Sequence, residues 1–143
     1  MRYINERFHT RLFRTMLAGF LLAITVELPT AYADTKAELI GSWVGAIIVD
    51  NVPIGIDLTI QEVKVNNEGG EIHYGEPRAC RLAIVYTTMH ESYYWFSLKN
   101  STGGFCDKLE SGRLKLKLKD SNHLTFETTS KAGTVIDSGE LEK

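Results

Sequence analysis

The residue types that most often carry chemistry are few in this chain and stand far apart. Beyond residue 33 the histidines are His73, His90 and His123, and no two have the short spacing of a metal-binding pair on one element. The serines include no Gly-x-Ser-x-Gly nucleophile motif. The glycine pairs at 69–70 and 103–104 are typical of turns and do not begin a helix that could cradle a phosphate. We therefore predict no catalytic, cofactor-binding or metal-binding residue, and a protein that is not an enzyme.

The two cysteines, Cys80 and Cys106, predict a structural disulfide. Two thiols are too few for a zinc site, and their spacing is not that of a Cys-x-x-Cys redox pair. A hairpin that turns at residues 87–90 would set Cys80 opposite Ser97. A plain third strand would then hold Cys106 about two strand spacings away, whereas a disulfide needs Cα atoms roughly 4.4 to 6.8 Å apart. The segment 100–109 is therefore expected to fold back over the end of the sheet.

The segment 91–98 is the most aromatic part of the chain and is the main candidate for binding. In a strand, alternate side chains point to opposite faces. Tyr94 and Phe96 therefore share the core face with Leu82, while the other set faces outward as an apolar patch with charged residues at its rim. Tyr, Trp and Arg are enriched among the anchor residues of binding surfaces. The outward set predicted to bind a partner comprises Arg81, Val85, Glu91, Tyr93 and Trp95.

The segment 100–109 has several interpretations. It carries binding groups at one end of the fold, as loops on a stiff scaffold often do, or it closes that end with Phe105 as the apolar cap. It also has the length to cover Tyr93 and Trp95, which would turn the outward patch into a small second core.

The elements that position these residues are strands. Alternation of apolar and polar residues at period two runs from Gly41 nearly to the C-terminus, and in 113–119 three leucines alternate with four cations. Turn residues separate the runs at short intervals. The pattern predicts an all-β fold with no helix after residue 33, either an up-and-down barrel or a two-sheet sandwich of about eight strands. The expected strands span 41–49, 53–64, 70–75, 79–87, 91–98, 112–119, 122–129 and 134–142.

Residues 1–33 have the parts of a secretory signal peptide. Residues 2–14 are rich in arginine, residues 16–26 are uncharged and apolar, and Pro29 precedes the small-residue site that ends at Ala33. The apolar run is shorter than the roughly 20 residues of a membrane helix. We therefore expect cleavage near Ala33, a single domain at 34–143, and a periplasmic or secreted bacterial protein that is not integral to the membrane.

Length and composition limit the possible partners. The 143 residues are 43% hydrophobic and carry a formal charge of −2, which fits one globular domain. Because there is no basic excess, a nucleic-acid partner is not expected.

The Gly41-Ser42-Trp43 sequence opens the first expected strand, and a meander of short strands follows it. This arrangement resembles the opening of the calycin barrels, the lipocalin and avidin group of small exported proteins. In that group such a Trp closes one end of the barrel. The resemblance implies a closed barrel and, as an alternative function, a carrier of a small apolar ligand. Many bulky inward residues argue against a large cavity, since an eight-strand barrel is just wide enough for side chains to fill it.

These observations together predict a non-enzymatic, exported binding protein of the bacterial cell envelope. We expect it to hold a protein or an envelope glycan through its aromatic face or one barrel mouth. A narrower form of this hypothesis is an inhibitor of a secreted hydrolase such as a lysozyme, by analogy of fold and compartment. The carrier of a small apolar ligand is the alternative, and no cofactor is expected.

Overall fold

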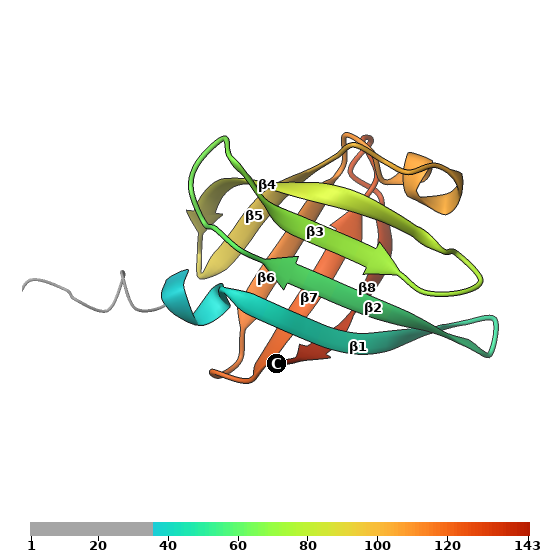
Figure 1. Ribbon diagram of the computed structural model, residues 1–143, viewed down its shortest axis with the longest axis horizontal. Coiled ribbons are helices and arrows are strands. Elements are labelled where there is room, and N and C mark those ends of the chain that lie inside the picture. The colour runs from blue at the N-terminus through green and yellow to red at the C-terminus, as the bar shows by residue number, and fades with distance from the viewer. Residues whose placement is uncertain (1–35) are drawn as a thin grey trace, which may run out of the picture.

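A computed structural model describes residues 36–143, so the predicted signal peptide at 1–33 lies outside the described residues. The chain is all-β, and consecutive antiparallel strands form a closed barrel in the order β1 to β8 (Figure 1). The predicted barrel is confirmed over the sandwich alternative. The strands are β1 (Gly41–Val49), β2 (Val52–Ile60), β3 (Glu68–Tyr74), β4 (Cys80–His90), β5 (Tyr93–Lys99), β6 (Arg113–Leu118), β7 (His123–Thr129) and β8 (Val135–Glu142).

The period-two pattern places one face of every strand inside the barrel. In β6, Leu114 and Leu116 are fully buried, whereas Arg113 and Lys117 are exposed. The expected core face of β4 and β5 is confirmed, because Leu82 and Phe96 are also fully buried. Inward side chains from all eight strands pack into one cluster, so burial of apolar area along the whole barrel axis stabilises the fold.

One end of the barrel is closed around Trp43. A short helical turn at 36–39 precedes β1, and the buried indole N–H of Trp43 donates a hydrogen bond to the Leu39 carbonyl at 2.9 Å. The ammonium group of Lys143 lies 4.9 Å from the centre of the Trp43 ring. Trp43 is fully buried at this end of the core.

The opposite end is closed by the segment between β5 and β6, which contains the short 3-10 helix η1 (Gly104–Lys108) (Figure 1). The predicted disulfide joins Cys80 to Cys106 with the Cα atoms 5.9 Å apart. Phe105 packs edge-on against Tyr74, with ring centres 5.4 Å apart. The expectation that 100–109 folds back over the sheet end is confirmed, and Phe105 is part of the closure.

A buried ion pair lies beneath η1. Arg78 donates to the Asp137 carboxylate at 2.6 Å, and their side chains are 12% and 3% exposed. The Arg78 guanidinium also lies 3.5 Å from the centre of the Phe105 ring. Nearby, the Tyr74 hydroxyl shares a 3.4 Å hydrogen bond with Thr128, and burial raises the pKa of Tyr74. Asp137 is thus a buried carboxylate on β8.

The hairpin between β4 and β5 differs from its prediction. The turn is formed by Glu91 and Ser92, both with positive φ, instead of residues 87–90. A bulge between Tyr86 and Thr88 adds a residue to β4, as bulges do. As a result, Ser97 faces Val85 and not Cys80. The prediction that 100–109 folds back over the end of the sheet is nevertheless confirmed.

The described chain also contains two short helical segments, the turn at 36–39 and η1, where the pattern predicted no helix. Both lie at barrel ends, and neither has the length over which apolar periodicity can be recognised. Among residues 36–143, no helix is long and apolar enough to cross a membrane.

Candidate functional site

The most distinctive outer surface of the barrel is a strip of aromatic and cationic side chains on β5 and β6. Tyr93 and Trp95 are partly buried and lie on the outward face of β5. Trp95 faces Lys115 in the register between the strands, and Ser97 faces Arg113. We call this surface the aromatic-cationic strip; its members are Tyr93, Trp95, Arg113, Lys115 and Lys117.

Cations of β6 lie close to both aromatic rings. The Lys115 ammonium group is 4.3 Å from the centre of the Tyr93 ring and 5.4 Å from that of Trp95. Lys117 lies 5.2 Å from Tyr93, and Arg113 lies 6.0 Å from Trp95. At these distances a cation is attracted by the ring quadrupole, worth about 0.5 to 1 kcal/mol at an exposed site. The side chains of the strip therefore order one another before any partner arrives.

A hollow of about 480 Å³ lies over the strip. Tyr93 and Trp95 line it together with hydroxyl-bearing residues of β4 and β5 and the cations Arg113 and Lys115. The Thr87 hydroxyl donates to the Trp95 carbonyl at 2.8 Å, which fixes the bulged part of β4 against β5. Glu91 lines the rim, with its side chain 78% exposed. The hollow is lined by Thr87, Thr88, His90, Glu91, Tyr93, Trp95, Ser97, Arg113 and Lys115.

The structure brings together some of the predicted binding residues and separates others. Tyr93, Trp95 and Glu91 line the hollow over the strip. Arg81 lines a different hollow, and Val85, partly buried in the middle of β4, lines neither. The prediction treated one face of β4 as continuous with one face of β5. In the structure β4 pairs with Tyr93 at its end, whereas Arg81 lies near its start, where its backbone is hydrogen-bonded to Thr102.

The segment 100–109 does not cover the aromatic residues in the described part of the chain. Its residues line none of the hollow over Tyr93 and Trp95. The Arg81 N–H donates to the Thr102 hydroxyl at 3.0 Å, and the Thr102 N–H donates to the Arg81 carbonyl at 3.1 Å. The loop is thus held away from Tyr93 and Trp95, which stay partly exposed.

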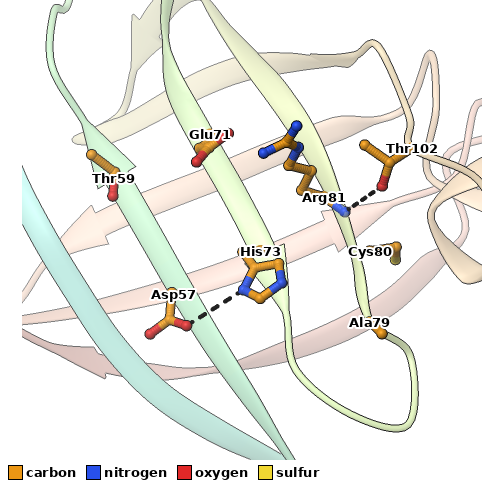
Figure 2. A pocket seen from close by; sticks show the side chains of 8 residues that line it. All are labelled: Asp57, Thr59, Glu71, His73, Ala79, Cys80, Arg81 and Thr102. Atoms are coloured by element: carbon orange, nitrogen blue, oxygen red, sulfur yellow. Dashed lines mark hydrogen bonds and ion pairs between the residues drawn. The ribbon is translucent and has the colours of Figure 1, made fainter.

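The second hollow, also about 480 Å³, lies on the outer face of β2, β3 and β4. Figure 2 shows Asp57, His73 and Arg81 side by side on these strands, in the row that the register gives. His73 Nδ1 lies 3.6 Å from the Asp57 carboxylate, and the two side chains are 48% and 62% exposed. Because both groups are well solvated, this contact is a weak surface pair.

The other two histidines of residues 36–143, His90 and His123, also lie on the surface beside carboxylates. His90 is 3.9 Å from Glu91, and His123 is 2.9 Å from Asp120. Within residues 36–143, no three His, Cys, Asp or Glu side chains are grouped so that they could hold a metal ion.

The side chains that point into the barrel argue against the carrier alternative. Trp43, Tyr74 and Phe96 are the bulkiest of many fully buried side chains, and the hollow over the strip lies on the outer surface. One interior polar atom, the Tyr94 hydroxyl, has no hydrogen-bond partner among the described residues.

The sequence interpretation missed the cations of the strip. It recognised that Arg113, Lys115 and Lys117 face outward, but it did not place them beside Tyr93 and Trp95. The strict alternation of β6 shows that these cations share one face. It places them beside Tyr93 and Trp95 only once β5 and β6 are known to be neighbours.

Comparisons with known proteins gave no assignment. A scan against protein-family models, a search of curated proteins and a search of solved structures each found no match.

Proposed function

We propose that this protein is a non-enzymatic, exported binding protein of the bacterial cell envelope that holds a protein or an envelope glycan on the aromatic-cationic strip. The observation that carries the proposal is the hollow over Tyr93 and Trp95, with cations 4.3 to 6.0 Å from their rings. Partly buried aromatics beside Arg are the composition of binding anchors. The disulfide supports export, since such bonds persist in oxidising compartments.

The scaffold supports a binding role because the strip lies on rigid elements. Tyr93 and Trp95 are on a strand paired on both sides, by β4 and by β6. Their inward neighbours Tyr94 and Phe96 are 2% and 0% exposed. Side chains on such a strand are pre-organised, which lowers the entropy lost on binding.

Capture from envelope extract tests the proposal. We expect the full chain to retain a partner, and Tyr93→Ala and Trp95→Ala to lose at least tenfold in affinity while their melting temperatures stay within a few degrees of the parent. Ile48→Ala is the matched control, because Ile48 is 68% exposed on β1, away from the strip. Equal capture by the parent and both aromatic variants would refute the proposal.

Inhibition of a secreted hydrolase is a narrower form of the same proposal. The same variants test it in a lysozyme assay, where the parent should inhibit and Trp95→Ala should not. The excess of positive charge on the strip favours an anionic partner surface.

A further inference from the structure

We propose that the aromatic-cationic strip binds an anionic glycan, a polysaccharide whose repeat carries carboxylate, phosphate or sulfate groups. This inference rests on the proposed function and names the ligand class of the same surface. Its basis is the combination of unpaired cations, partly open aromatic rings and a ligand-sized hollow at one place.

The positive charge of the strip is not neutralised by the protein. Within residues 36–143, Arg113, Lys115 and Lys117 have no carboxylate oxygen within the 4.0 Å of an ion pair. By contrast, Lys119, which directly follows β6, lies 2.9 Å from Glu140 of β8. An anion that reaches the strip therefore gains charge-assisted contacts without first breaking an internal ion pair. This local excess stands out in a chain with a formal charge of −2.

Two carboxylates lie near the strip and moderate its charge. Glu127 faces Lys115 in the register of β6 and β7, and Glu91 lines the rim of the hollow. Glu91 is 3.9 Å from His90 and highly exposed. Three cations against these two carboxylates still leave a positive strip, and loss of the Glu91 charge should strengthen the binding of an anion.

The aromatic rings and hydroxyls favour a sugar as the carrier of that negative charge. Tyr93 and Trp95 are two residues apart on one face of β5, so their rings are spaced by roughly 7 Å along the strand. Aromatic rings offer flat apolar surfaces, against which the C–H face of a sugar can pack. Thr88 and Ser97 add hydroxyl groups to the hollow, and these can bond to the hydroxyls of the sugar.

Two neighbouring hollows extend the strip toward β7 and β8, and Glu127 lines both of them. One of about 480 Å³ shares Trp95 and Arg113, and another of about 370 Å³ shares Tyr93 and Lys115. The central hollow lies in the 300 to 1,000 Å³ range of small-ligand sites. Such adjoining hollows fit a narrow polymer better than a protein surface, which needs roughly 800 Å² of contact on each partner.

Calorimetry and Trp fluorescence with defined polymers test the inference on the full-length expressed chain. The probes are polygalacturonate and its neutral methyl ester, dextran sulfate and neutral dextran, and polyglutamate as an acidic polypeptide. We expect at least one anionic glycan to bind at least tenfold more tightly than its neutral counterpart and than polyglutamate, with affinity that falls as salt rises.

Variants assign that binding to the strip. Trp95→Ala and Lys115→Ala should each lose at least tenfold in affinity, and Glu91→Gln should gain about twofold or more. Lys64→Ala is the matched control, because it removes an exposed cation from the loop between β2 and β3, and it should bind as the parent does.

The outcomes separate this inference from the proposed function. Binding of polyglutamate as tight as that of the glycans, or binding of neither glycan, would overturn the glycan assignment. The proposed function survives that result if envelope capture still depends on Trp95. Glycan binding unaffected by Trp95→Ala and Lys115→Ala would overturn the assignment to the strip.

Discussion

Arg78 and Asp137 form an ion pair across 59 positions of sequence, at 2.6 Å, inside the end of the barrel that η1 closes. The Asp137 carboxylate is nearly inaccessible to solvent, and Arg78 lies between it and the ring of Phe105. Because the pair joins the β3–β4 loop to β8, it links segments that the disulfide does not cross-link. We expect it to fix the closure of this end.

Loss of one partner should cost far more than loss of both. Arg78→Ala leaves a buried carboxylate without its cation, which costs about 3 to 5 kcal/mol of the free energy of unfolding. The Arg78→Ala/Asp137→Ala double variant removes both charges, and we expect it to be less destabilised than the sum of the single variants by at least about 1 kcal/mol. Urea unfolding of the four proteins measures the coupling. Additive single effects would show that the two side chains act independently.

The disulfide should stabilise the barrel without affecting the strip. Cys80 and Cys106 are 26 residues apart, and the chain-entropy relation gives about 3.5 kcal/mol for a loop of that length. The Cys80→Ser/Cys106→Ser variant should therefore unfold at lower urea with a loss of roughly this size. Since neither cysteine lines the hollow over Tyr93 and Trp95, its binding of an anionic glycan should match that of the parent at temperatures where the barrel is folded. A loss of less than about 1 kcal/mol in the free energy of unfolding would contradict the predicted stabilisation by the disulfide.

The faces of the strands could be predicted from the sequence, but their register could not. Alternation correctly assigned Leu82, Tyr94 and Phe96 to the core, since a period of two is a direct consequence of strand geometry. The bulge near Thr87 has no such signal. It adds one residue to β4, and the turn moves to Glu91 and Ser92, which are not the Asn-Gly type that marks a tight hairpin.

The candidate site was predictable in part for a similar reason. Tyr93 and Trp95 were identified from one strand alone, because both residues lie on its outward face. Their cationic neighbours come from β6, and the 100–109 segment left open whether β6 lies beside β5. Arg78 and Asp137 were missed altogether. Arg78 lies in the β3–β4 loop and Asp137 on β8, so neither is recognised as half of a buried ion pair until the fold brings them together.

Two glycines offer a direct test of the backbone packing. A Cβ on Gly112 would collide with the carbonyl oxygen of Thr129, whereas a Cβ on Gly55 would meet nothing within 4 Å. Gly112→Ala must therefore move β6 away from β7, at a cost of about 2 to 3 kcal/mol. Gly55→Ala is the matched control and should change the free energy of unfolding by less than about 0.5 kcal/mol. Thermal unfolding of both variants decides the matter, and equal effects would argue against the close approach at Gly112.

The turn between β6 and β7 should show a depressed carboxyl pKa. Asp120 accepts hydrogen bonds from the Asn122 N–H at 2.8 Å, the His123 N–H at 2.9 Å and the His123 ring. The Asn122 bond is the largest cause that holds the pKa of Asp120 below its ordinary value of 3.8, and the His123 side chain is the next. A carboxyl pKa that is lower in the folded state stabilises the fold above the ordinary value, and this contribution is lost as pH falls through the folded pKa.

An NMR titration of the side-chain carboxyl carbon checks this directly. The midpoint for Asp120 should lie below 3.8, and His123→Ala should raise it only part of the way, because the Asn122 N–H still donates. Asp120→Ala should lower stability at pH 7 and have no such effect at a pH below the midpoint, where the parent carboxyl is protonated. A full return to the ordinary pKa in His123→Ala would instead show that the imidazole, and not the backbone of the turn, holds the carboxylate.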